Sequence, residues 1–259
     1  MVITGGTGVL GREIGEYLAL QGAKVVLMGR NEETGKQIVD GIRGKGGEAM
    51  FLRTDVMNPA VVEQNLQDVL SAYGRVDALL NAAGGNMPGA TIAPDKTFFD
   101  LEIDAFKKVV DLNLFGTVLP TMVFAGIMVD QKKGSIVNFC SESALRPLTR
   151  VVGYGTAKAA IANFTKYMAG ELALKFGDGL RVNAIAPGFF LTDQNRTLLT
   201  NPDGSLTDRS KTILAHTPFG RFGEPEDLYG TIQYLISDAS KFVTGTVAVI
   251  DGGFDAFSI

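Results

Sequence analysis

Short runs of apolar residues alternate with longer amphipathic segments along most of the 259-residue chain. The apolar runs predict strands at residues 1–4, 24–28, 49–53, 76–80, 134–139, 180–185 and 246–249. The amphipathic segments predict helices over 32–45, 59–73, 104–131, 154–176 and 225–237, after a first helix that ends near residue 21. Strands that are apolar throughout, and not only at alternate residues, are typical of a parallel sheet covered on both faces.

This alternation predicts an α/β fold of the Rossmann type: a doubly wound sheet of seven parallel strands with helices on both faces. No internal repeat or linker divides residues 1–259, so we interpret them as a single domain. Residues 191–217 interrupt the alternation with polar and turn residues. A long insertion at the carboxyl edge of a sheet favours a substrate lid, and a surface loop without that role is the alternative.

Composition narrows the possible partners and the compartment. Apolar residues make up 46% of the chain and charged residues 20%, while the net charge of −4 and the lack of a basic tract argue against nucleic acid. Without a continuous apolar run of membrane length or a signal-peptide pattern, the sequence predicts a cytoplasmic protein that has no membrane span. One cysteine, Cys140, and one histidine, His216, are too few for a disulfide or an ordinary zinc site, so no metal is expected.

Tyr154 and Lys158 stand four residues apart on a predicted helix, and Ser141 precedes the tyrosine by thirteen residues. Positions i and i+4 share one face of a helix, so the ammonium group can lie next to the phenol. A nearby cation stabilises a phenolate, and we expect it to lower the pKa of Tyr154 from about 10 toward neutrality. Such a pair also occurs by chance on solvated helix faces, so its meaning depends on the rest of the chain.

A glycine-rich turn at residues 4–11 follows the first strand and precedes the first helix, which is the setting in which a turn binds a pyrophosphate. After the second strand, Gly29 stands where an acidic residue would bind a ribose 2′-hydroxyl, and Arg30 could bind a 2′-phosphate. This favours NADP(H) over NAD(H), although an arginine stacked on adenine would suit either cofactor. Asp55 could accept a hydrogen bond from the adenine amino group or only belong to a turn.

Together these features resemble a classical short-chain dehydrogenase/reductase over essentially the whole chain. The resemblance rests on the order and spacing of the turn 4–11, the segment 81–84, Asn113, Ser141, Tyr154 with Lys158, Pro187-Gly188 with Thr192, and the segment 251–253. The turn departs from the family because its glycines stand at 5, 8 and 11, with Val9 at the place of the usual second glycine. The chain also begins directly at the first strand, which we therefore expect to be short.

The resemblance implies a catalytic tetrad of Asn113, Ser141, Tyr154 and Lys158. Tyr154 would exchange the proton, and Ser141 would polarise the substrate carbonyl. Lys158 would lower the tyrosine pKa and bind the nicotinamide ribose, while Asn113 would hold a water that links Lys158 to solvent. The resemblance also implies that a dinucleotide contacts Gly5, Thr7, Gly8, Val9, Leu10, Arg30, Asp55, Val56, Asn81, Ala83, Gly84, Tyr154, Lys158, Pro187, Gly188 and Thr192, with Asn81 steadying the central strands.

The loops around the predicted site resemble those of D-mannonate oxidoreductases, also called fructuronate reductases. Arg146 and Arg150 could then form a fork for the substrate carboxylate, with surface ion pairs as the alternative explanation. Hydroxyl groups could bind Asn86, Gln194 and Asn195, and Ser141 would also contact the substrate. A 3-ketoacyl thioester or a polyol is the alternative substrate, and a dinucleotide-binding protein without catalysis is the alternative class. Family members usually assemble as tetramers through helices that correspond to 104–131 and 154–176, so we expect a homotetramer.

Overall fold

The computed structural model describes residues 1–192 and 199–257. Within these ranges seven strands form one parallel sheet, in the order β3-β2-β1-β4-β5-β6-β7. The strands are β1 (Val2–Thr4), β2 (Lys24–Gly29), β3 (Glu48–Arg53), β4 (Ala78–Asn81), β5 (Gly134–Phe139), β6 (Leu180–Pro187) and β7 (Val247–Ile250). The chain winds outward in both directions from β1 and β4, which confirms the predicted doubly wound α/β sheet. The first strand is short, as expected.

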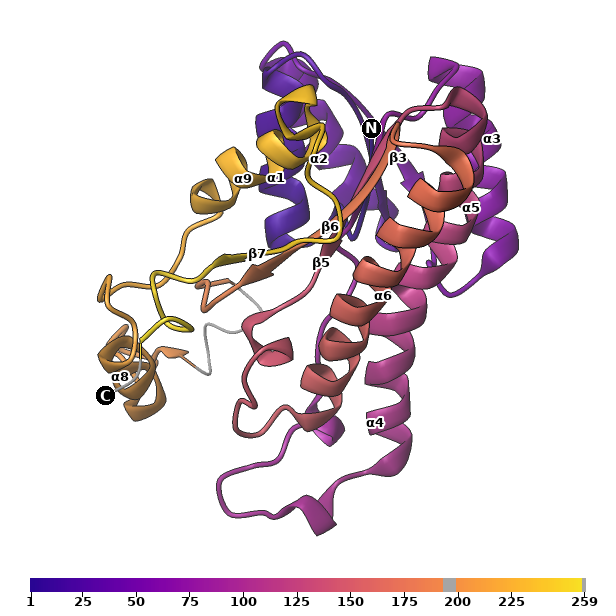
Figure 1. Cartoon of the computed structure of the whole chain (residues 1–259). Coiled ribbons are helices and arrows are strands. Elements are labelled where there is room, and N and C mark those ends of the chain that lie inside the picture. Colours follow the sequence, from indigo (N-terminus) through magenta and orange to yellow (C-terminus); the bar gives the residue numbers. More distant parts are fainter. Residues whose placement is uncertain (193–198, 258–259) are drawn as a thin grey trace.

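Helices cover both faces of this sheet (Figure 1). One face carries α1 (Val9–Leu20), α2 (Glu32–Gly44) and α9 (Glu226–Ile236). The other carries α3 (Pro59–Tyr73), α5 (Gly116–Gln131) and α6 (Val152–Phe176). The predicted helix bounds agree with these to within two residues, except for the helix predicted over 104–131.

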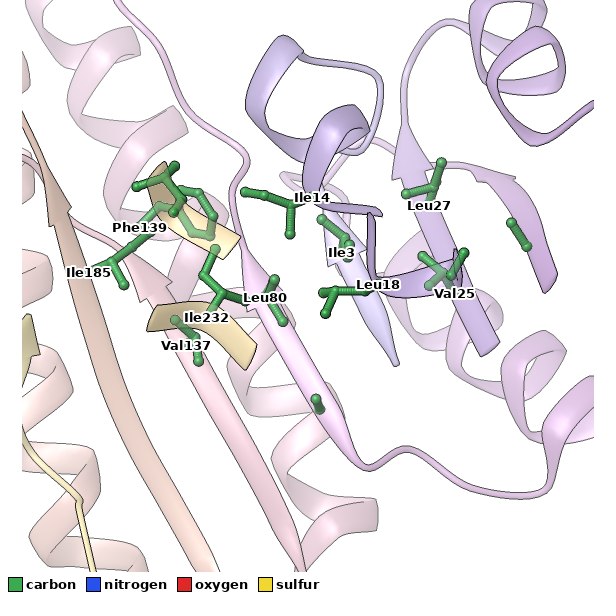
Figure 2. Packing of buried hydrophobic residues seen from close by; sticks show 14 of the residues in the cluster. Ile3, Ile14, Leu18, Val25, Leu27, Leu80, Val137, Phe139, Ile185 and Ile232 are labelled. Atoms are coloured by element: carbon green, nitrogen blue, oxygen red, sulfur yellow. The ribbon is translucent and has the colours of Figure 1, made fainter. Parts of the chain in front are cut away.

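The core on the α1 side fixes the strands whose ends carry the site. Ile3, Leu27 and Leu80 from three strands of the sheet pack in one cluster with Ile14 of α1 and Ile232 of α9 (Figure 2). All five side chains are fully buried. Burial of an aliphatic side chain of this size contributes about 1.5–3 kcal/mol, so the sheet is a rigid base for the loops at its carboxyl edge.

The predicted helix over 104–131 is interrupted in the structure. α4 (Ile103–Val110) and α5 are joined by one π-helical turn, η3 (Asp111–Phe115), in which the hydrogen-bond pattern widens. Asn113 lies in this turn and is fully buried. The hydrophobic periodicity could not predict the interruption, because a π-turn adds one residue without changing the apolar character of the helix.

Taken together, Ile103–Gln131 is the only helix of the described residues that has the length and composition to cross a membrane. The helix Ile103–Gln131 shares this length and composition with the core helices of soluble proteins. Its apolar residues are explained by packing, because Phe124, Ala125 and Met128 belong to the buried cluster between the sheet, α3 and α6. Because this helix packs against the sheet and against α3 and α6, it carries core residues on the sides that make these contacts.

Outside the two helical layers, the described residues also include short helical turns and the separate helix α8. The turns are η1 (Pro88–Ala90), η2 (Phe98–Asp100), η4 (Glu142–Ala144) and η5 (Asp238–Ser240). The helix is α8 (Asp208–Ala215), which lies near the C-terminal end of the chain in Figure 1. α8 falls in the predicted lid of residues 191–217, of which 193–198 lie outside the described residues.

Candidate active site

The glycine-rich turn after β1 closes because its glycines allow backbone contacts that no side chain would permit. Gly5 has φ +68°, and its carbonyl accepts a hydrogen bond from the amide of Gly8 at 2.9 Å. A Cβ atom on Gly11 would lie 2.4 Å from the Gly5 carbonyl oxygen. Val9 is the first residue of α1, so the turn keeps its compact form with a side chain at the usual second glycine.

This turn and its surroundings fit the pyrophosphate of a dinucleotide. The N-cap of α1 is Gly8, which has no capping side chain, so the first N–H groups of the helix are available to an anion. The Thr4 hydroxyl accepts a hydrogen bond from the amide of Ala83 at 3.2 Å and so holds the turn against the segment after β4. Thr7 and Leu10 of the same turn are partly exposed. The dinucleotide-binding prediction for these residues is therefore compatible with the geometry.

The adenosine end of the predicted site lies beyond β2 and β3. A Cβ atom on Gly29 would lie 2.7 Å from the Thr7 hydroxyl oxygen, so a larger residue at position 29 would require Thr7 to move. Arg30 is exposed and forms no ion pair with any residue in the described ranges. Asp55 accepts a hydrogen bond from the amide of Met57 at 3.0 Å, as a turn residue does, while Val56 is buried.

Asn81 at the end of β4 holds the middle of the sheet together. Its amide nitrogen donates to Asn138 of β5 and to Thr121 of α5, both at 2.9 Å. The side chain is 1% exposed, so it acts inside the fold and steadies the central strands. Farther along the edge, Gly188 follows Pro187 of β6 and packs closely on Asp251, and Thr192 is partly exposed.

The predicted reacting groups meet where β5 and α6 come together. The Tyr154 hydroxyl lies within reach of a hydrogen bond with Ser141. Ser141 is the second residue after β5, and Cys140 stands between the strand and the serine. The Lys158 ammonium lies 5.4 Å from the centre of the Tyr154 ring and donates to the Phe139 carbonyl at 2.7 Å. Because β5 supplies both Phe139 and the approach to Ser141, one rigid strand end positions the serine and the lysine together.

The electrostatics of this group differ from the expectation. Burial raises the pKa of Tyr154 to about 12, although the Ser141 hydroxyl opposes this rise. Burial also lowers the pKa of Lys158 to about 8, with the thiol of Cys140 opposing the change. The expected lowering of the tyrosine pKa by Lys158 is therefore not found, because desolvation of the phenol is the largest influence on its pKa. At neutral pH the protein holds a protonated phenol beside a lysine that is still mostly charged.

Asn113 comes close to the lysine through the π-turn. Its amide nitrogen donates to the carbonyls of Gly85 and Val109, and its amide oxygen accepts from the Gly85 amide at 3.1 Å. A Cβ atom on Gly84 would lie 2.5 Å from that oxygen and 3.3 Å from the Lys158 ammonium. The glycine after β4 thus lets the backbone pass between Asn113 and Lys158.

The predicted substrate residues are distributed differently from the expectation. Arg146 pairs with Asp255 at 2.6 Å and also donates to its backbone carbonyl, so it cannot form a free fork with Arg150. Asn86 is likewise engaged, because its side chain bonds Thr91 and the next amide within its own loop. Arg150 donates through Nε to the Ile92 carbonyl at 2.9 Å. Gln194 and Asn195 lie outside the described residues.

Two charged residues near the site were not predicted from the sequence. Glu142 directly follows Ser141, and its carboxyl group is buried, with no hydrogen-bond partner for either oxygen among the described residues. The only feature of the sequence that could have indicated a buried Glu142 is its place between two serines directly after a buried strand. Arg209 of α8 donates to the Thr149 hydroxyl at 2.9 Å across sixty residues of sequence. No spacing pattern could have indicated that contact.

Comparison with known proteins places the chain in a family. A family model described as enoyl-(acyl carrier protein) reductase matches residues 7–255. The chain is a short-chain dehydrogenase/reductase. Members of this family are NAD(P)-dependent oxidoreductases, and the predicted family and enzyme class are thereby confirmed.

Sequence relatives of this short-chain dehydrogenase/reductase have mixed names. It is 43% identical to an uncharacterised oxidoreductase, UxuB, of Bacillus subtilis, over 99% of this chain and 95% of the relative. It is also 33% identical to a 3-oxoacyl-[acyl-carrier-protein] reductase of Synechocystis, over 99% of this chain and 96% of the relative. The family is therefore established by these relatives, while the substrate is not.

Solved structures agree with the fold over almost the full length of the enzyme. A Haemophilus influenzae protein proposed to be a D-mannonate oxidoreductase, solved with NAD bound, is 39% identical and has a TM-score of 0.93, covering 99% of this chain and 95% of its own. A gluconate 5-dehydrogenase from Burkholderia cenocepacia, in complex with NADP and tartrate, is 29% identical and has a TM-score of 0.88. The match covers 99% of this chain and 95% of the Burkholderia cenocepacia chain. Structural relatives of this enzyme thus bind either dinucleotide.

Proposed function

We propose that the protein interconverts a secondary alcohol and a ketone at the meeting point of β5 and α6. The observation that supports this most directly is the cluster in which the Tyr154 phenol faces Ser141 while the Lys158 ammonium lies against its ring. When bound, the dinucleotide supplies or accepts the hydride. The same cluster argues against a dinucleotide-binding protein without catalysis, which would have no use for a buried lysine beside a tyrosine.

The protonation states favour a particular role for each side chain. Tyr154, whose pKa is about 12, is protonated at neutral pH and can donate its proton to the alkoxide that forms as a ketone is reduced. Ser141 would donate a hydrogen bond to the same oxygen and stabilise its developing charge. Lys158, still charged at neutral pH, would stabilise the phenolate that remains and bind ribose hydroxyls. Asn113 would act as a positioning residue, because its amide lies close to the lysine and the segment after β4.

The cofactor would lie along the carboxyl edge of the sheet, with its phosphates at the turn 4–11 and its adenosine beyond Arg30. Arg30 is exposed and has no ion pair among the described residues, and the adjacent Gly29 leaves no room for a carboxylate, so we favour NADP(H) modestly over NAD(H). Binding of both cofactors to wild type and to Arg30→Ala tests this preference. A selective loss of NADP(H) affinity supports it, and an equal change for both cofactors removes it.

For the substrate we propose a hydroxy or keto sugar acid of the D-mannonate and D-fructuronate type. The similarity to the Haemophilus influenzae structure supports this class. A 3-ketoacyl thioester is the second candidate, favoured by the Synechocystis relative. Initial rates with mannonate, fructuronate, an acyl thioester and a polyol, each with NAD(H) and NADP(H), decide between them. Turnover of the thioester alone would refute the sugar-acid assignment.

A homotetramer and a lid are further parts of this proposal. The helices over 103–131 and α6 expose apolar side chains, including Phe115, Met122 and Tyr167, which are 45%, 69% and 63% exposed. Large apolar side chains on neighbouring helices favour contact with a second subunit. Light scattering on the purified protein would reveal a mass near four chains. The α8 helix would form the described part of the lid over the substrate.

A further inference from the structure

Two arginines from separate elements come close together at the loop that leads into α6 and to Tyr154. Arg150 lies four residues before Tyr154, at the entry to α6, with φ +78°. Arg209 lies on α8 and donates through Nη1 to the hydroxyl of Thr149, the neighbour of Arg150, at 2.9 Å. The hydrogen bond between Arg209 and Thr149 therefore brings α8 against the loop that leads to the tyrosine.

Neither arginine has a carboxylate partner within residues 1–192 and 199–257. The other arginines near the C-terminal edge behave differently, since Arg146 pairs with Asp255 and Arg221 pairs with Asp227 in two hydrogen bonds. Partial burial, and then the positive charge of Arg150, lower the pKa of Arg209. Two cations that repel each other while partly desolvated are unfavourable unless an anion lies between them.

The remaining hydrogen-bond donors suit a carboxylate. A guanidinium has five N–H groups in a planar fork. Arg150 uses Nε for the Ile92 carbonyl, and Arg209 uses one N–H of Nη1 for Thr149. Each arginine therefore keeps donors on its terminal nitrogens, and its planar head is already oriented by a fixed contact. This pre-organisation lowers the entropy that a bound carboxylate would otherwise have to overcome.

We infer that Arg209, together with Arg150, binds the carboxylate of the substrate, which makes α8 the element that selects acids over neutral sugars. The inference rests on the proposed function, because it assigns residues to the sugar-acid end of the same site. It also replaces the fork of Arg146 and Arg150 expected from the sequence, in which Arg146 is already neutralised by Asp255. Binding of the acid would remove the repulsion and hold α8 against the loop at Thr149 and Arg150.

The test compares Arg209→Ala and Arg209→Lys with a control on the same helix, Lys211→Ala. Lys211 is exposed and, in the part of the chain that the structure describes, pairs with Asp208 of its own helix, so its removal tests the integrity of α8 without removing either arginine. Calorimetry with cofactor-loaded protein measures binding of D-mannonate and of D-mannitol, which carries a hydroxymethyl group in place of the carboxylate. Steady-state rates with the same two compounds are measured in parallel.

Loss of two charge-assisted hydrogen bonds predicts that Arg209→Ala weakens mannonate binding about 10- to 100-fold. Arg209→Lys should recover part of that loss, and mannitol binding and the Lys211→Ala variant should be unchanged. Equal effects of Arg209→Ala on acid and polyol would overturn the inference, even if wild type turns over mannonate. If wild type turns over only a different carbonyl compound, the proposed function fails. In that case the inference is tested by mannonate binding alone. It is refuted if Arg209→Ala binds mannonate as tightly as wild type does.

Discussion

Glu142 offers a measurable consequence of burying a carboxyl group beside the active site. Its side chain is 1% exposed, and neither carboxyl oxygen has a hydrogen-bond partner among the described residues. Burial, followed by the negative charges of Asp255 and Asp251, raises the pKa of Glu142 from 4.5 to about 7, and Arg146 only partly opposes this. Ionised Glu142 is therefore destabilising in the folded protein, and substitution by glutamine should remove that effect.

The magnitude follows from linkage between protonation and folding. A pKa of about 7 in the folded protein against 4.5 in the unfolded chain corresponds to about 3 kcal/mol. Because the folded value is the higher one, the stabilising contribution of protonated Glu142 is complete below pH 4.5. It is lost as the pH rises to 7 and stays constant above that. Between pH 5 and pH 8 the wild type should lose about 2.5 kcal/mol through this group.

The assay is urea unfolding of wild type and Glu142→Gln at half-unit steps from pH 5 to pH 8. Titrating groups that do not interact with Glu142 affect both proteins alike, so the difference between the two free energies of unfolding reports on Glu142 and its coupling to Asp251 and Asp255. We expect that difference to shift in favour of the variant by about 2.5 kcal/mol over this range. Glu63→Gln, on the exposed face of α3, is the matched control and should give a curve parallel to wild type.

A constant difference between wild type and Glu142→Gln would refute the reasoning. It would mean that Glu142 titrates alike in both states, so that water or a shifted Arg146 solvates its carboxylate in the folded protein. A difference of the opposite sign, with the variant losing stability as the pH rises, would indicate a stabilising ion pair with Arg146 instead. Either result would mean that the carboxylate of Glu142, in the turn that follows Ser141, has a solvating partner in the folded protein.

Three further predictions concern the reacting groups. Tyr154→Phe should bind either cofactor normally but lose turnover by at least about a thousandfold, and retained turnover would exclude the phenol as proton donor. Because burial lowers the pKa of Lys158 to about 8, steps that need its charge should slow as the pH rises through 8, and a flat kcat profile from pH 7 to 9.5 would contradict that need. Gly84→Ala would place a methyl group 2.5 Å from the Asn113 amide oxygen. It should lower kcat while leaving the fold intact by circular dichroism, and unchanged kcat would argue against a positioning role for Asn113.

The fold could be predicted because its determinants are local. The apolar strands, the helical periodicity and the glycine-rich turn each appear within a few residues of sequence, and the bounds of α3, Pro59–Tyr73, agree with the prediction. The proximity of Tyr154 and Lys158 is also decided locally, because helix geometry alone places positions i and i+4 on one face. The π-turn at Asn113 was missed, because its hydrogen bonds leave no trace in the apolar pattern.

The pKa of Tyr154 was misjudged for a different reason. The sequence reveals that a lysine stands four residues from the tyrosine, but it does not reveal how far both are removed from water. Burial is the largest influence on the pKa of Tyr154, and burial is a property of the whole fold. Sequence spacing therefore indicated the partner correctly and the direction of the pKa shift incorrectly.

The arginines near the site illustrate why substrate residues are the hardest to predict. Arg146 and Arg150 stand four residues apart and looked equivalent as carboxylate ligands, yet Asp255, 109 residues away in the chain, neutralises only Arg146. Arg209 then reaches the neighbour of Arg150 across sixty residues. A carboxylate site requires cations that no protein carboxylate already satisfies, and that condition is decided by distant parts of the chain. The balance of charge around each guanidinium, and not its spacing from the catalytic serine, therefore identifies the arginines that remain available for a substrate.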